Sequence, residues 1–271
     1  MQVEHHRWWS PHLGQDMELH VYGYYGKPLL VFPAQGGRCH EFADFGMLGA
    51  ISGFVEAGQV KVFTVDSVDQ QSWGNSGAHP ADRARRHEDY DRYITREVVP
   101  FISGSCGGTE QKYFTTGCSM GGYHAANFFF RHPDIFDGMI SLSGLFQLRM
   151  FVGDYVDENV YFNSPILYLK NLSDAWYLDR YRESRIVVCA GQGAWEDDML
   201  ADAYELKRIL DAKGVPNWTD IWGHDVNHDW PWWQKMLPHV LSNFHLPAYS
   251  PPHQSTPETL RSGGVSAPPA A

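Results

Sequence analysis

The stretch Thr115-Thr116-Gly117-Cys118-Ser119-Met120-Gly121-Gly122-Tyr123-His124 places a serine between two glycines in the pattern G-x-S-x-G. The residues before it, 111–116, are β-branched and aromatic and predict a buried strand. The residues after it, 123–132, can continue as a helix. Strand, sharp turn and helix form a nucleophile elbow, which presents a strained serine at the end of the strand. The sequence therefore predicts Ser119 as a nucleophile, and the alternative is a glycine-rich turn without chemistry.

The composition fits one large domain and excludes some classes of partner. The chain has 271 residues, of which 43% are hydrophobic, enough for a single large core. The formal net charge of −11 argues against nucleic acid or an anionic membrane as a partner. No apolar run reaches the roughly 18 residues of a membrane span, and no signal peptide is expected. Four cysteines without a C-x-x-C pair favour a reduced, cytoplasmic protein.

Strands and helices alternate along most of the chain. Buried strands are predicted at 27–33, 61–66, 111–116, 138–144, 185–191 and 218–223, after two antiparallel edge strands at 3–9 and 17–25. Helices are predicted at 42–57, 79–99, 123–132, 197–213 and 230–244, and the second of them is expected to stop at Pro100. This alternation predicts an α/β fold with a mostly parallel sheet and helices on both faces.

Two other segments are less regular. Residues 146–182 are expected to be irregular, with helical pieces, and to lie over the active face. From Pro247 onward the chain consists mostly of Pro, Ser, Gly and Ala, which cannot build a core. We therefore expect one domain over 1–246 and a disordered tail over 247–271.

An activated serine needs a histidine base and a carboxylate that orients this base. In elbow-type hydrolases the order along the chain is serine, acid, histidine. Glu196 and Asp197 follow the strand at 185–191, and Glu196 is preferred because it is nearer to the strand. The alternative is that these carboxylates only favour the amino end of the next helix. The base is predicted at His228, immediately before the N-cap of the last helix.

The oxyanion of such a reaction needs two backbone amides. The first is the amide of Met120, directly after the nucleophile. The second should come from the loop after the strand at 27–33, where either Gln35 or Gly36 could supply it. The sequence does not decide between these two amides, and that of Gln35 is the preferred candidate.

No metal or cofactor is expected at this site. His224, Asp225 and His228 could be read as zinc ligands, but no other residue at ligand spacing supports them. Aromatic residues are expected around the substrate pocket, with core packing as the alternative. The tryptophans in predicted rim loops are Trp73, Trp176, Trp195 and Trp230.

Residues 117–122, 191–196 and 228–233 together resemble the esterase D-like family of α/β-hydrolases, which includes S-formylglutathione hydrolases, feruloyl esterases and the antigen 85 mycolyltransferases. The resemblance extends from residue 1 to about 246. It implies an α/β-hydrolase fold without a large cap domain. It also implies a serine carboxylesterase whose triad is Ser119, an acid at Glu196 or Asp197, and His228. The loop at 32–37 departs from the thioesterase members, so formylglutathione is not implied as substrate.

These observations predict a serine carboxylic-ester hydrolase that acts through an acyl-enzyme on small or aromatic acyl esters. An acyltransferase with the same triad is one alternative, and a non-catalytic binding protein on the same fold is another. The expected partner is a small-molecule ester, and the sequence does not exclude a homo-oligomer.

Overall fold

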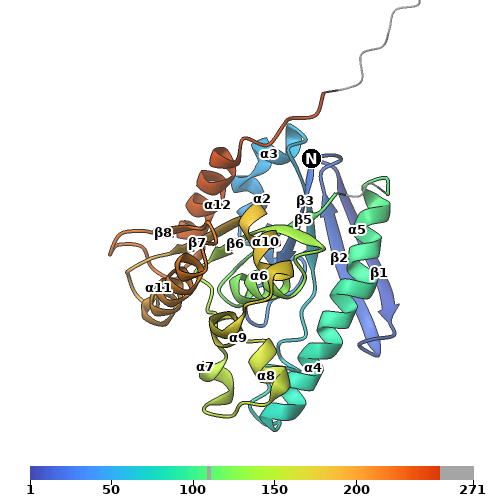
Figure 1. Cartoon of the computed structure of the whole chain (residues 1–271). Coiled ribbons are helices and arrows are strands. Elements are labelled where there is room, and N and C mark those ends of the chain that lie inside the picture. The colour runs from blue at the N-terminus through green and yellow to red at the C-terminus, as the bar shows by residue number, and fades with distance from the viewer. Residues whose placement is uncertain (109–110, 251–271) are drawn as a thin grey trace, which may run out of the picture.

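The computed structural model describes residues 1–108 and 111–250 of the chain (Figure 1). In this part eight strands form one sheet in the order β1-β2-β4-β3-β5-β6-β7-β8. The first two pairings, β1 with β2 and β2 with β4, are antiparallel, and the remaining neighbours are parallel. The predicted mostly parallel α/β sheet is confirmed. The strands are β1 (Val3–Ser10), β2 (Gln15–Tyr22), β3 (Lys27–Phe32), β4 (Val60–Val65), β5 (Tyr113–Cys118), β6 (Phe136–Leu142), β7 (Arg185–Ala190) and β8 (Trp218–Ile221).

Helices cover both faces of the sheet, and each face has its own hydrophobic core. On one face Phe63 of β4 packs in a cluster with Phe128 and Leu206. On the other face Val31 of β3 packs with Ile51 and Leu237. The first face carries α4 (Pro80–Tyr93), α5 (Val99–Ser105), α6 (Met120–Arg131), α9 (Pro165–Asn171), α10 (Ala175–Glu183) and α11 (Asp197–Ala212); the second carries α1 (Glu41–Asp44), α2 (Met47–Ala50), α3 (Ser52–Glu56) and α12 (Trp230–Phe244).

The helix predicted to stop at Pro100 does not stop there. After α4 the chain passes through a π-helical segment, η1 (Ile94–Val98), and continues as α5 to Ser105. Pro100 lies in the first turn of α5, where a missing backbone N–H leaves no helical hydrogen bond unmade. The change of helical pitch in η1 therefore accommodates a proline that would otherwise end the helix.

The segment 146–182 is more regular than predicted. It contains α7 (Arg149–Val152) and α8 (Glu158–Phe162) in addition to α9 and α10. The side chain of Asp157 accepts a hydrogen bond from the amide of Val160 and so caps α8. The helical pieces expected in this segment are present as α9 and α10, and α7 and α8 are two further short helices before them.

The predicted tail lies mostly outside the described residues, since 251–271 are not described. Within the described residues 247–250, the Tyr249 amide donates to the carbonyl of Ala57 at 2.9 Å. The Tyr249 ring also packs against Tyr25, with 4.7 Å between ring centroids. The first residues after 246 therefore pack against the folded domain.

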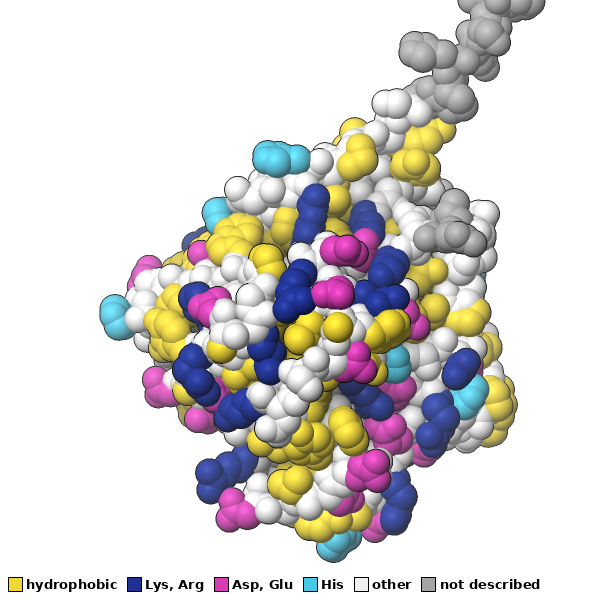
Figure 2. All heavy atoms as spheres, in the orientation of Figure 1, with side chains coloured by type: hydrophobic (Ala, Val, Ile, Leu, Met, Phe, Trp, Pro, Cys, Tyr) yellow, Lys and Arg dark blue, Asp and Glu magenta, His cyan; other side chains and the backbone are white. Residues whose placement is uncertain are grey.

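The surface shows no field of one charge sign on the face drawn in Figure 2. There Lys and Arg side chains lie among Asp and Glu side chains. Ion pairs on the molecule include Arg131–Glu88 and Arg182–Asp179. Among the described residues, no helix is both long enough and apolar enough to cross a bilayer.

Candidate functional site

Ser119 occupies a sharp turn between β5 and α6. Its backbone has φ 56° and ψ −119°, a conformation that is costly for a residue other than glycine. A Cβ on Gly117 would lie 2.4 Å from the carbonyl carbon of Gly121, and one on Gly121 would lie 2.3 Å from the oxygen of Phe32. Both glycines are needed because strand, helix and the neighbouring β3 end pass so closely. The predicted succession of strand, turn and helix is present.

His228 reaches Ser119 from the loop between β8 and α12. Its Nε2 lies 2.8 Å from the Oγ of Ser119. The His228 amide donates to the carbonyl of Ala194 at 3.0 Å, and Asp229 caps α12 by accepting from the amide of Trp230. His228 is thus fixed from both sides. His224 is exposed, and within the described part of the chain no contact joins its ring to Ser119.

Glu196 lies behind His228 and is fully buried. Its Oε1 is 3.3 Å from Nδ1 of His228. Asp197 and Asp198, in the first turn of α11, are exposed instead. The contact between Glu196 and His228 lacks the alignment of a full hydrogen bond. Of the two candidate acids, only Glu196 is brought against the histidine.

The loop that carries the acid and the loop that carries the base are hydrogen-bonded to each other. The Gly193 amide donates to the carbonyl of Val226 at 2.8 Å, and the Ala194 amide donates to Oδ1 of Asn227 at 2.8 Å. A Cβ on Gly191 would lie 2.1 Å from the oxygen of Val226. Glycine at this position is therefore required for the two loops to meet.

Ser143 was not identified from the sequence. It follows β6 directly, is fully buried and has a positive φ of 49°. Its Oγ donates to Oε1 of Glu196 at 2.6 Å and accepts from Nε1 of Trp233 at 2.9 Å. A signal existed, because polar residues at the carboxyl ends of neighbouring parallel strands meet at one edge of the sheet.

The loop after β3 is arranged around Glu41. The amide of Ala34 donates to Oε2 of Glu41 at 2.7 Å, and the amide of Gly37 donates to the carbonyl of Ala34 at 2.9 Å. Burial raises the pKa of Glu41. Between these two fixed amides lie Gln35 and Gly36. Within residues 1–108 and 111–250, no acceptor is hydrogen-bonded to the amides of Gln35, Gly36 or Met120.

The four tryptophans expected at a pocket rim separate into two groups. Trp73 is fully buried in the core, and Trp176 lies on α10 with the guanidinium of Arg180 3.9 Å from its ring, beside a cavity that contains no triad candidate. Trp195 is 85% exposed and directly precedes Glu196. Trp230 stacks on Phe45 with 4.5 Å between ring centroids.

A cavity of about 470 Å³ lies beside the loop after β3. Its lining residues are Gln35, Gly36, Gln70 and residues 74–76, and none of the three candidate triad residues is among them. The loop that carries the candidate oxyanion donor therefore borders a space that can hold a small molecule.

His224, Asp225 and His228 do not converge as metal ligands. Among the described residues, the His, Cys and carboxylate side chains whose donor atoms do converge are Glu18, His20 and Cys39. They lie on a different loop and strand from the three candidate triad residues.

A family model described as "Putative esterase" matches residues 10–244. No curated protein matches the chain in sequence. Solved structures with a similar fold include a ferulic acid esterase, with a TM-score of 0.70, 20% identity and coverage of 89% of this chain and 96% of the other. Another is the S-formylglutathione hydrolase FrmB of Staphylococcus aureus, with a TM-score of 0.64, 16% identity and coverage of 89% of this chain and 97% of the other. A third is MPT51 of Mycobacterium tuberculosis, with a TM-score of 0.68, 15% identity and coverage of 90% of this chain and 97% of the other. At these identities the likeness concerns the fold.

Proposed function

We propose that this chain, which belongs to the "Putative esterase" family, is a serine carboxylic-ester hydrolase with a catalytic triad of Ser119, Glu196 and His228. The observation that carries the proposal is the 2.8 Å contact between Nε2 of His228 and Oγ of the strained Ser119. A nucleophile within hydrogen-bond reach of a base that is itself oriented by a third group is the arrangement of nucleophilic catalysis.

Acylation begins when Ser119 attacks the ester carbonyl. The proton of Oγ passes to Nε2 of His228 as the new C–O bond forms, and the buried carboxylate of Glu196 stabilises the imidazolium. The negative charge on the carbonyl oxygen is stabilised by the amides of Met120 and Gln35, which form the proposed oxyanion hole. His228 then gives the proton to the leaving alkoxide, and the acyl-enzyme remains.

Deacylation repeats these steps with water. His228 takes a proton from the water molecule, whose oxygen attacks the acyl carbonyl. The tetrahedral intermediate collapses, the acid leaves, and the proton returns to Ser119. The two half-reactions therefore use the same base and the same oxyanion donors.

The substrate we propose is a small-molecule ester with a small or aromatic acyl group. Aromatic side chains next to the triad support this proposal. The ring of Trp233 lies 5.0 Å from the rings of both His228 and Trp230, and Trp230 stacks on Phe45. A protein with a similar fold is named a ferulic acid esterase, and ferulic acid is aromatic. The buried free thiols of Cys39, Cys118 and Cys189 support a cytoplasmic location.

The test is a panel of p-nitrophenyl esters of increasing acyl length together with a phenylpropenoyl ester, assayed with wild type and with Ser119→Ala. We expect wild type to hydrolyse the short and aromatic esters and to be labelled by a fluorophosphonate. The variant should stay folded and lose both properties. Ser105→Ala, at the end of α5, is the matched control and should keep both.

Two results would contradict the proposal. Stoichiometric labelling of Ser119→Ala would place the nucleophile elsewhere, and a folded wild type with neither turnover nor labelling would indicate a binding protein. Adding an acceptor alcohol separates hydrolysis from acyl transfer, because a transferase forms the new ester in preference to the free acid.

A further inference from the structure

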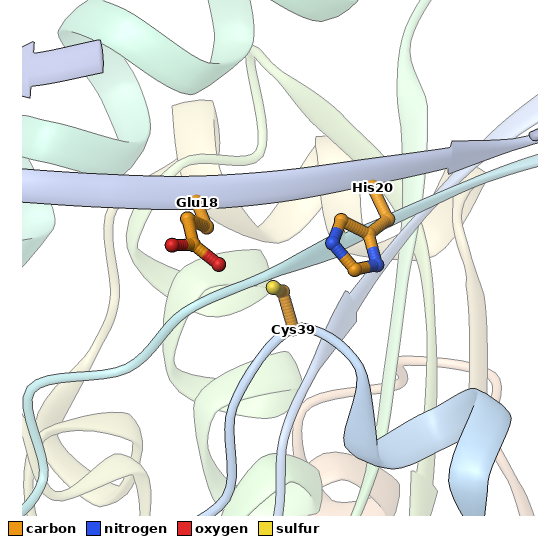
Figure 3. A group of neighbouring side chains, drawn as sticks. All are labelled: Glu18, His20 and Cys39. Atoms are coloured by element: carbon orange, nitrogen blue, oxygen red, sulfur yellow. The ribbon is translucent and has the colours of Figure 1, made fainter. Parts of the chain in front are cut away.

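Three side chains with metal-binding donor atoms converge on the side of the sheet next to the β1–β2 hairpin. One ligand atom from each of Glu18, His20 and Cys39 lies within 4.8 Å of the other two. Glu18 and His20 project from the same face of β2, since alternate residues of a strand share a face. Figure 3 shows both side chains directed toward the thiol of Cys39, which comes from the loop before α1.

Asp66 holds the two segments that carry these donors. Its Oδ1 accepts from the amide of Cys39 and its Oδ2 accepts from the amide of Glu18, each at 3.0 Å. Arg38 donates to Oδ1 at 2.7 Å. Burial acts to raise the pKa of Asp66, but these hydrogen bonds outweigh it and the pKa is lowered. These hydrogen bonds fix the positions of the two segments relative to each other.

The donor atoms of Glu18 and His20 are suited to accept a cation. The Glu18 carboxylate forms ion pairs with Arg38 at 3.5 Å and with Arg7 at 3.9 Å, but among the described residues it accepts no hydrogen bond. The ring nitrogens of His20 face Nδ1 of His5 at 3.1 Å and Oη of Tyr22 at 3.2 Å. Whichever nitrogen binds a metal, the other keeps a partner that orients the ring, as metal-ligating histidines usually have.

Cys39 is 1% exposed. Burial, followed by the charge of Asp66, raises its pKa to about 12. Binding of a metal ion would replace the thiol proton, which would leave to solvent.

We propose that Glu18, His20 and Cys39 form a binding site for Zn²⁺, with a water molecule as the fourth ligand. Zinc accepts one oxygen, one nitrogen and one sulfur ligand in a tetrahedral arrangement, whereas Mg²⁺ and Ca²⁺ prefer oxygen ligands alone. Ligands at 2.0–2.3 Å from a tetrahedral ion are roughly 3.3–3.8 Å apart, so binding would draw the three donors slightly together. The bound ion would tie the hairpin to the loop after β3.

The experiment uses the full chain, treated with a chelator and a phosphine reductant and then titrated with Co²⁺ as a spectroscopic substitute for Zn²⁺. We expect one Co²⁺ per chain, a thiolate-to-cobalt charge-transfer band in the near ultraviolet, and the visible bands of tetrahedral cobalt. Zn²⁺ should displace the cobalt and raise the melting temperature by several degrees. Cys39→Ser should lose the charge-transfer band, and Cys106→Ser, a cysteine away from the cluster, should keep it.

The proposal is overturned if excess Co²⁺ produces no charge-transfer band in wild type, or if the band persists in Cys39→Ser. Should Cys39→Ser fail to fold, Glu18→Gln gives a second test at a partly exposed residue. Its affinity for Zn²⁺ by calorimetry should fall at least about tenfold, and unchanged affinity would overturn the site. None of these measurements depends on esterase activity.

Discussion

Ser143 Oγ donates a 2.6 Å hydrogen bond to Oε1 of Glu196, the same oxygen that lies 3.3 Å from Nδ1 of His228. Trp233 donates to Ser143 Oγ at 2.9 Å and so fixes the direction in which the hydroxyl points its proton. All three groups behind His228 are buried. The orientation of the proposed acid is therefore set by β6 and α12 and does not depend on its own loop alone.

Ser143→Ala should lower kcat about tenfold to a hundredfold, which corresponds to the loss of one hydrogen bond to a charged group. Alanine meets the same backbone constraint at φ 49° as serine, so KM should change little, whereas the loss of the acceptor of the buried Trp233 Nε1 should cost about 1–3 kcal/mol of stability. The kcat–pH profile should also shift, because a misdirected carboxylate stabilises the imidazolium less. Stopped assays over a pH series measure both effects. An unchanged kcat, or a loss of stability that explains the whole loss of rate, would leave Ser143 with a structural role only.

Glu196→Gln should lower kcat by up to about four orders of magnitude with little change in melting temperature, because an amide cannot stabilise the imidazolium. Asp197→Asn is the control at an exposed position in the first turn of α11. It should keep its turnover and lose only a small amount of stability, as expected for a charge near a helix end. The opposite pattern would assign the acid to Asp197. Steady-state kinetics and thermal unfolding of both variants decide between Glu196 and Asp197 as the acid.

His228→Ala should abolish turnover, and His224→Ala should keep a substantial share of it. The reason is distance, since only His228 contacts Ser119. Equal and complete loss in both variants would mean that the base is misassigned. A chelator added to wild type should not change the rate of ester hydrolysis, since no triad step involves a metal.

The parts of the site that sequence predicts are those with local signals. The elbow depends on glycines two residues from Ser119, and the acid and base follow strands whose apolar runs are readable. Ser143 escapes this reasoning because its role depends on Glu196, 53 residues later in the chain. Its position at the carboxyl end of a strand indicates the edge of the sheet where it lies, but does not identify Glu196 as its partner.

Two further differences have physical causes that a linear pattern does not contain. Pro100 normally ends a helix, but the π-helical turn before it removes the need for its missing donor. Trp73 lies in a polar loop, yet its ring is fully buried beside His87, at 5.1 Å between ring centroids. Loop position alone did not distinguish a rim residue from a core residue, whereas tertiary packing does.

Asp91→Asn tests an ionic contact outside the site, between α4 and the end of α6. Asp91 is 2.8 Å from Nε2 of His132 and 3.4 Å from Arg131. Burial acts to raise the pKa of Asp91, but His132 and Arg131 outweigh it and the pKa is lowered. A lowered folded-state pKa means that the ionised group stabilises above the unfolded value of about 3.9, and that this contribution is lost as pH falls through the folded value.

The variant should therefore be about 1–3 kcal/mol less stable than wild type near pH 7, and the difference should shrink below about pH 4. Urea unfolding at a series of pH values measures it. Asp82 is exposed on the same helix, so Asp82→Asn should show no such difference in stability from wild type. If the stability difference for Asp91→Asn stays constant down to pH 3, the stabilisation is not ionic in origin.

Glu41 should act as a positioning residue for the proposed oxyanion hole. Its carboxylate accepts from the amide of Ala34 at 2.7 Å, immediately before Gln35. The approach is possible because Gly37 has no side chain; a Cβ there would lie 2.3 Å from Oε1 of Glu41. Removing the acceptor frees the loop and misplaces an amide that the reaction needs.

Glu41→Ala should then lower kcat by up to about a hundredfold, since the loss of one oxyanion donor costs 10²–10³ in kcat. KM should change less, because the donor acts mainly on the charge that develops in the transition state. Glu41→Gln keeps an oxygen that can accept from Ala34 and should recover most of the rate. Asp44→Ala, exposed on the same short helix, is the control. If Glu41→Ala turns over at the wild-type rate, the second oxyanion donor does not come from this loop, and the other donor, Met120, must act without it.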